Sequence, residues 1–197
     1  MSRGVLGPTA GAVGLVVLVV VLLAVGGGTT TGGRGIVAGP DQAPVGGEPF
    51  VPAHDGRDLG DRLLRVAATQ LGVPYSWAGG GLVGPSRGLE AGASTVGFDC
   101  SALVRFAAYR ASGGRLLVPR TADAQTRVGT PVPLDQLRPG DVISFTRPGE
   151  TVAHHVGIYA GLGRMIHAPR TRARVRVESL GGAYWRSQRW RAARYVA

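Results

Sequence analysis

Residues 97–104 are Gly-Phe-Asp-Cys-Ser-Ala-Leu-Val, and they contain Cys100, the single cysteine of the chain. The apolar spacing that follows predicts a helix from Cys100 to Ala111, closed by Gly113-Gly114. Asp99 stands directly before this helix and is a preferred N-cap residue. The N–H groups and the positive dipole end of a helix N-terminus favour a thiolate over a thiol. On this evidence Cys100 is either a nucleophile or a small buried apolar residue.

A nucleophilic cysteine needs a base within hydrogen-bond reach, and the chain offers four histidines. His54 lies in a region predicted to be a linker, and we expect it to be an ordinary exposed residue. His154 and His155 are adjacent on a predicted strand, so only one of them can face the thiol. A turn at 161–163 would place His155 and His167 on one face of a hairpin, directly opposed or diagonal. One imidazole would then take the thiol proton while the other orients it, unless the two are unrelated surface histidines.

The chain divides into three parts by composition. Residues 1–28 contain an apolar run from about Ala10 to Val25 after the basic Arg3, which predicts an uncleaved membrane anchor or a cleaved signal, with the remainder outside the membrane. Residues 29–55 are rich in glycine and proline and predict a flexible linker. Residues 56–197 predict one α+β domain.

Within this domain a helical half precedes a β-rich half. Helical spacing extends from Leu59 to Leu71, with Asp58 as the N-cap and Gly72 as the stop. A glycine-rich loop and a long irregular stretch to Gly97 follow. Beyond Pro139 the pattern predicts an antiparallel sheet built from short strands, at Asp141–Phe145, His155–Tyr159, Arg164–Ala168, Arg174–Val177 and Arg191–Val196.

The charge balance is strongly basic, with a formal net charge of +10. Nine arginines of the last part of the sequence are opposed there only by Glu178: Arg164, Arg170, Arg172, Arg174, Arg176, Arg186, Arg189, Arg191 and Arg194. They form either a solvated strand face or a surface that attracts anionic wall polymers or lipid. No nucleic-acid-binding motif accompanies them, so no nucleic-acid partner is expected. The spacing of Cys and His fits no zinc site, no nucleotide loop is present, and no cofactor is expected.

Several motifs, in order, resemble the NlpC/P60 cysteine peptidases. Residues 97–104 resemble the nucleophile motif of that family, and Gln70-Leu-Gly-Val-Pro-Tyr-Ser-Trp-Ala-Gly-Gly resembles the loop before it. Pro119-Arg-Thr with Gln125, and the segments 137–145, 155–159 and 165–169, follow in the family's order. The resemblance covers about Arg62 to Val196, and the loop 84–96 is similar to that of actinobacterial cell-wall endopeptidases.

This resemblance implies a papain-like fold, with the nucleophile helix packed on the sheet that carries the histidines. It implies Cys100 as nucleophile, His155 as general base and His167 as the orienting third residue. Tyr75 would support the oxyanion site, and Asp99 and Ser101 would contact the amino end of the substrate. Two positions depart from the family, which usually has glycine where this chain has Ala78 and Ala102. An alanine at position 78 would restrict the loop that carries Tyr75.

The function implied is a peptidoglycan endopeptidase that cuts stem peptides, at the γ-linkage between D-glutamate and the diamino acid. Two alternatives stand beside it: a non-catalytic wall-binding or assembly module, and an amidase or acyltransferase on the same fold. The absence of a recognisable wall-binding domain suggests a larger envelope complex as a partner.

Overall fold

The computed structural model describes residues 58–196 of the chain. The predicted anchor or signal at 1–28 and the linker at 29–55 lie outside these residues, and so does His54. Within residues 58–196, no helix has the length and apolarity needed to cross a membrane. The domain predicted from residue 56 onward is therefore the part described below.

Two longer helices form the first half of the fold. Helix α2, Cys100–Ala111, has the predicted bounds: the Asp99 carboxylate accepts a hydrogen bond from the backbone N–H of Ala102 at 2.7 Å, which caps its first turn. Gly113 and Gly114 follow it with φ of +65° and +85°, a region that glycine enters without steric cost. Helix α1, Leu59–Ala68, ends three residues before the predicted Leu71.

The sheet is fully antiparallel and has six strands within the described residues, in the order β3-β8-β4-β5-β6-β7. All five predicted strands are present, with ends shifted by one or two residues. The sequence missed β3, which has three residues including a proline and lies at the edge of the sheet. The strand bounds are β3 Thr130–Val132, β4 Val142–Thr146, β5 His155–Gly161, β6 Arg164–His167, β7 Arg176–Ser179 and β8 Arg189–Arg194.

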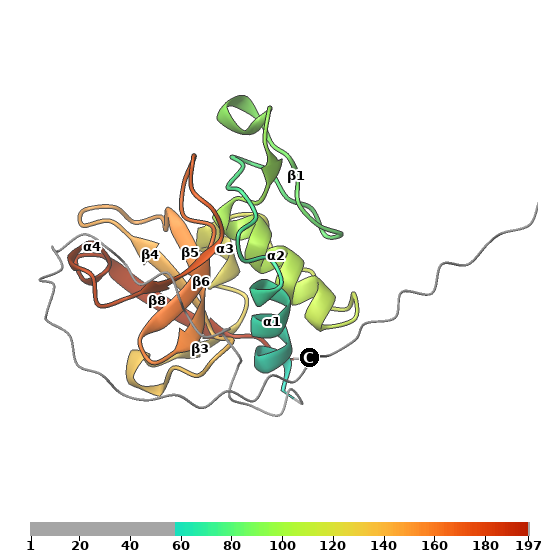
Figure 1. Ribbon diagram of the computed structural model, residues 1–197. Coiled ribbons are helices and arrows are strands. Elements are labelled where there is room, and N and C mark those ends of the chain that lie inside the picture. Colours follow the sequence, from blue (N-terminus) through green and yellow to red (C-terminus); the bar gives the residue numbers. More distant parts are fainter. Residues whose placement is uncertain (1–57, 197) are drawn as a thin grey trace, which may run out of the picture. The chain divides into compact units, whose positions relative to one another are not determined.

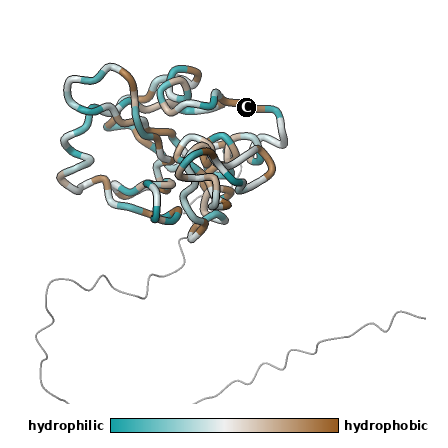
Figure 2. Tube along the Cα trace, turned by 90° about the horizontal axis from the view of Figure 1, so that it is seen from above, coloured by the Kyte–Doolittle hydropathy of each residue, from teal (hydrophilic) through white to brown (hydrophobic). Residues whose placement is uncertain are grey.

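The sheet separates two hydrophobic clusters because successive side chains of a strand point to opposite faces. Val142 of β4 and Val156 of β5 pack with α1 and α2, whereas Phe145 of β4 packs on the other face with Trp185. Trp185 belongs to the short helix α4, Ala183–Arg186. Figure 1 shows α1 and α2 on one side of the strands and α4 on the other. Hydrophobic stretches gather where these elements pack (Figure 2).

The stretch between α1 and α2 is more ordered than the sequence predicted. Ser86–Arg87 (β1) and Val96–Gly97 (β2) pair as a small antiparallel sheet, and the 3₁₀ helix Glu90–Gly92 (η1) lies between them. This hairpin projects beyond the start of α2 in Figure 1. The remaining helical turns are α3, Ala122–Gln125, and η2, Leu134–Gln136. The hairpin and α3 both border the cleft described below.

Candidate active site

Cys100 is the first residue of α2 and is held there by contacts on both sides. The segment before it pairs with the Tyr75 loop: the Phe98 N–H donates to the Pro74 carbonyl at 3.2 Å, and the Ser76 N–H donates to the Phe98 carbonyl at 3.0 Å. On the other side, the backbone N–H of Val156 donates to the thiol group. Helix α2 therefore delivers the sulfur directly to the start of β5.

The electrostatic environment of Cys100 differs from the sequence expectation. Burial, together with the neighbouring Asp99 carboxylate, raises the pKa of the thiol to about 12. The N–H groups of Ser101 and Val156 and the Arg120 guanidinium lower it, but they do not compensate. In the resting site the desolvation of the thiol outweighs the helix end, which by itself favours a thiolate. Cys100 is a thiol that needs a base at the moment of attack.

His155 and His167 are brought together on neighbouring strands. His155 Nε2 lies 2.8 Å from His167 Nδ1, and the ring planes meet at 87°. The two residues are diagonal across β5 and β6, since Ile158 pairs with Ile166 around the turn at 162–163. Trp185 packs against both imidazoles, with ring centroids 5.4 and 5.5 Å away. Burial lowers the pKa of both histidines, so both rings are neutral in the resting site.

Glu178 continues this chain of hydrogen bonds. Its Oε2 lies 3.0 Å from His167 Nε2 and also accepts from Arg176, while its Oε1 accepts from the Trp185 indole at 2.8 Å. These donors hold the pKa of Glu178 far below its ordinary value, so it is a carboxylate that can only accept.

The carboxylate fixes the tautomers of both rings. His167 must donate its Nε2–H to Glu178, which leaves Nδ1 of His167 as an acceptor. His155 must then donate its Nε2–H to that nitrogen. The remaining ring nitrogen, Nδ1 of His155, carries the free lone pair that a general base needs.

Sequence reasoning missed the part that Glu178 plays. It counted Glu178 only as the acid opposing an arginine cluster. The alternation of side chains along the strands could have indicated it. Strand β6 pairs with β7 so that His167 lies opposite Arg176, and Glu178 is therefore diagonal to His167 on the same face of the sheet. Glu178 lies 11 residues after His167, and the register of the pairing between their two strands could not be set from the sequence.

The two other polar residues beside the nucleophile are joined by an unpredicted arginine. Arg120 forms an ion pair with the Asp99 carboxylate and donates to Ser101 Oγ at 2.8 Å. Ser101 in turn donates to Asp99 Oδ1 at 3.0 Å. Asp99 thus caps α2 and is already paired with a cation, so its carboxylate is not a free anion beside the thiol.

Tyr75 is placed beside the nucleophile, as the resemblance implied. It is buried, and its pKa is raised by burial and by the proximity of Cys100. Ala78, which stands where the family usually has glycine, adopts φ of +57°. In this left-handed region an alanine is strained and a glycine is not. The loop is therefore kept in the geometry that a glycine would take, with Gly79 and Gly80 packed against Ser76 and Phe98.

Most of these groups border one open cleft of about 1030 Å³, whereas His167 is fully buried and does not line it. Cys100, His155 and Tyr75 lie along it, with Trp77 and Leu89 from the loop side and Tyr184 from the α4 side. Within residues 58–196, no three His, Cys, Asp or Glu side chains gather as metal ligands would. The cleft can thus present a thiol, a neutral imidazole base and a carboxylate that stabilises the base once it is protonated.

A cysteine at a helix N-terminus, beside an antiparallel sheet that carries a hydrogen-bonded histidine pair, defines an α+β domain with the groups needed for thiol chemistry. The chain belongs to the NlpC/P60 family, whose sequence model matches residues 72–194.

Similar proteins fall within this family. Peptidoglycan endopeptidases RipA and RipB of Mycobacterium tuberculosis are 42% identical over 127 residues and 41% identical over 151 residues. These matches cover 64% and 74% of this chain, but only 26% of RipA and 60% of RipB. The gamma-D-glutamyl-L-lysine dipeptidyl-peptidase of Bacillus subtilis is 33% identical, over 66% of this chain and 39% of that protein.

Solved structures show the same fold. RipD of M. tuberculosis, described as a non-catalytic NlpC/P60 domain protein adapted to peptidoglycan binding, superposes with a TM-score of 0.60 and 32% identity. The match covers 71% of this chain and 99% of the RipD chain. The fold therefore occurs both in endopeptidases and in a binding protein, and function must be argued from the site.

Proposed function

We propose that this protein is a peptidoglycan hydrolase that cleaves stem peptides with Cys100 as nucleophile and His155 as general base. The observation that carries the proposal is the relay from His155 through His167 to Glu178, which leaves a lone pair on His155 Nδ1. A binding module would have no need to bury two neutral imidazoles beside a thiol and to hydrogen-bond them to a half-buried carboxylate.

The chemistry follows from the resting protonation states. His155 Nδ1 takes the thiol proton as Cys100 Sγ attacks the peptide carbonyl, and the new positive charge is stabilised through His167 by Glu178. The tetrahedral intermediate collapses to a thioester, and His155 returns the proton to the leaving amine. Water, deprotonated by His155, then attacks the thioester carbonyl and releases the carboxylic acid, with the proton returning to the thiol.

The oxyanion of this intermediate needs donors beside Cys100. The N-terminal N–H groups of α2 are the natural source, and the Tyr75 hydroxyl lies close enough to the sulfur for their charges to interact. Burial keeps Tyr75 protonated, so that it can act only as a neutral donor to a developing negative charge. Tyr75 is therefore the proposed side-chain contribution to the oxyanion site.

We propose the γ-linkage of D-glutamate to the diamino acid as the bond cleaved, on the wall side of the membrane. The named activity of the B. subtilis relative and the family resemblance support this choice. Because Arg120 already neutralises Asp99, recognition of a substrate ammonium by Asp99 would have to compete with this ion pair. The protein is accordingly expected to accept stem peptides whose amino end is still attached to the glycan.

A mass-spectrometric assay tests the proposal. The purified full chain is incubated with soluble wall fragments whose stem peptides are either intact on the glycan or released. New γ-D-glutamyl ends that disappear in a folded Cys100→Ala variant are expected. Binding of the fragments without cleavage would favour the module, as in RipD. Release of whole stem peptides, or transfer to an added amine, would favour the amidase or acyltransferase.

A further inference from the structure

The arginines of the last part of the sequence do not form one uninterrupted basic surface. Arg194 pairs with Asp141 at 2.7 Å, and Arg176 pairs with Glu178. Glu178 is the only acid in this part of the sequence, but β8 lies beside β4, which brings Asp141 to Arg194. Arg189 and Arg191 stand in the first half of β8, and within residues 58–196 neither forms an ion pair with a carboxylate. They form a separate basic element.

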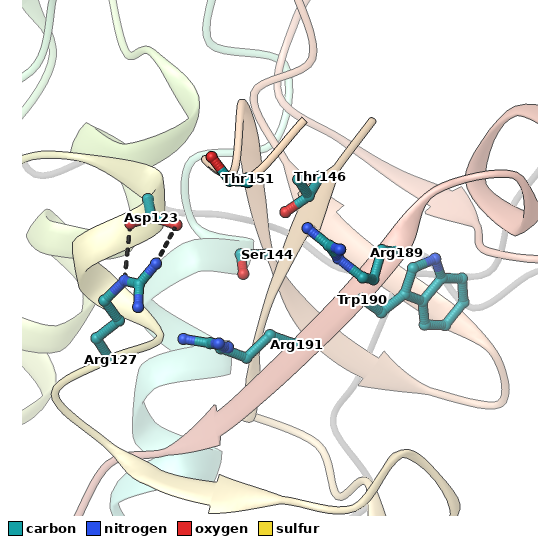
Figure 3. A pocket seen from close by; sticks show the side chains of 8 residues that line it. All are labelled: Asp123, Arg127, Ser144, Thr146, Thr151, Arg189, Trp190 and Arg191. Carbon is teal, nitrogen blue, oxygen red and sulfur yellow. Dashed lines mark hydrogen bonds and ion pairs between the residues drawn. The ribbon is translucent and has the colours of Figure 1, made fainter. Parts of the chain in front are cut away.

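The strand register aims these two arginines into a pocket. Arg191 lies opposite Ser144 and Arg189 opposite Thr146, so all four side chains share one face of the sheet. Beyond the sheet, Arg127 and Asp123 close the pocket from the α3 side, as Figure 3 shows. The pocket holds about 390 Å³, at the small end of the range for ligand sites. It is distinct from the catalytic cleft and shares none of its lining residues.

The pocket has unused donors and an excess of positive charge. Three guanidinium groups face one carboxylate, Asp123, which is already bound by Arg127 at 2.8 Å. Arg189 donates to the Glu150 carbonyl at 2.8 Å, whereas within residues 58–196 the Arg191 side chain has no hydrogen bond or ion pair. In Figure 3 the Arg191 side chain extends across the mouth toward Arg127. The site thus has the composition of an anion site.

The floor supplies a neutral donor as well. Ser144 is buried, and its hydroxyl shares one 2.8 Å hydrogen bond with Thr126 Oγ1. When Thr126 donates, the Ser144 O–H is free to donate into the pocket. Guanidinium forks combined with a hydroxyl match the several oxygens of a phosphate group better than the two of a carboxylate.

We propose that this pocket binds a phosphodiester group of a linear anionic polymer of the cell envelope. A recessed floor at Ser144 suits a single group carried on a flexible chain, whereas a flat lipid surface would meet only the arginine tips. The choice of an envelope polymer rests on the proposed function, but the phosphate chemistry does not.

The location of the pocket gives such binding a consequence. Asp123 also accepts from the Ala153 N–H at 3.1 Å, and Ala153 borders the catalytic cleft. The loop that joins β4 to β5 therefore has Thr151 at the pocket and Ala153 at the cleft. A polymer held by Arg191 would keep the cleft at the wall and raise the local concentration of stem peptides.

The test measures binding separately from cleavage. The full chain with Cys100→Ala is titrated calorimetrically with inorganic phosphate, poly(glycerol phosphate), phosphatidylglycerol vesicles and duplex DNA. Arg191→Gln and Arg189→Gln are compared with Arg164→Gln, which removes an arginine that is also exposed, on β6. Thermal unfolding verifies that each variant is folded. The Nε signal of Arg191 in ¹⁵N NMR spectra reports on the site itself.

Each outcome decides the proposal. Binding of phosphate and of the polymer, a shift of the Arg191 signal, and about tenfold weaker polymer binding in the two β8 variants but not in Arg164→Gln would support it. Equal weakening in all three variants would indicate general charge attraction and overturn it. If Arg191 matters for binding of vesicles or DNA but not for binding of the polymer, the assignment of the ligand as an envelope polymer is overturned. Failure of the polymer and of phosphate to bind would also overturn it. None of these results depends on whether the protein cleaves peptidoglycan.

Discussion

Replacement of Glu178 by glutamine tests the hydrogen-bond relay most directly. Two hydrogen bonds of 3.0 and 2.8 Å and two imidazole rings separate the carboxylate from His155 Nδ1. The charges are then on the order of 8 Å apart, and an effective dielectric constant of about 20 gives an interaction of about 2 kcal/mol. Loss of this stabilisation of the protonated His155 predicts kcat/KM about 30-fold lower in Glu178→Gln, through kcat.

The assay is initial-rate hydrolysis of a purified stem peptide under saturating and subsaturating conditions. Glu90→Gln, in the η1 turn and outside the cleft, removes the same charge and is the matched control. The variant should also have a lower kinetic pKa for His155, because the Glu178 charge raises it in the native site. An unchanged kcat in a folded Glu178→Gln variant would refute the relay, and an effect confined to KM would show that Glu178 only shapes the cleft.

Three further predictions concern the same site. The acidic limb of the pH profile of kcat/KM should have its midpoint below pH 6.5, because burial lowers the pKa of His155. Activity is present above this lowered pKa and is lost as the pH falls through it. A midpoint above pH 6.5 would contradict the assignment of His155 as the base. Asp99→Asn should lower the pKa of Cys100 from about 12, seen as a shift to lower pH in the rate of alkylation by iodoacetamide, whereas an unchanged profile would deny the effect of Asp99. Ala78→Gly should stabilise the fold by about 1 kcal/mol in thermal or urea unfolding, since φ of +57° strains alanine. The matched change Ala93→Gly, at φ of −62°, should destabilise by a similar amount, and equal signs for both would refute the strain argument.

The sequence was sufficient for elements with strong local signals. Helix α2 was predicted to the residue because Asp99 and Gly113-Gly114 mark its ends. Two short strands and a glycine turn predicted that His155 and His167 approach each other, either directly opposed or diagonally, and in the structure they are diagonal. Both features depend on residues that are close in sequence, so they could be predicted without any tertiary contact.

What the sequence could not provide were contacts between distant segments. The pairing of Arg120 with Asp99 spans 21 residues, and that of Arg194 with Asp141 spans 53. The resting state of Cys100 also escaped prediction, because desolvation depends on packing that no helix-end argument contains. The ion pairs and the desolvation both depend on which segments pack together in space, and proximity in sequence does not give this.

The position of β8 has a consequence for when the enzyme can act. This strand comes after every other described strand in the chain, yet it lies inside the sheet, between β3 and β4. A chain that emerges from a ribosome or a translocation pore therefore cannot complete its sheet until Arg189–Arg194 has passed. Cys100 leaves long before this point, whereas the sheet that carries His155 and His167 is incomplete until the final strand is inserted. We therefore expect the proposed hydrolase to acquire its activity only after the whole domain has been delivered.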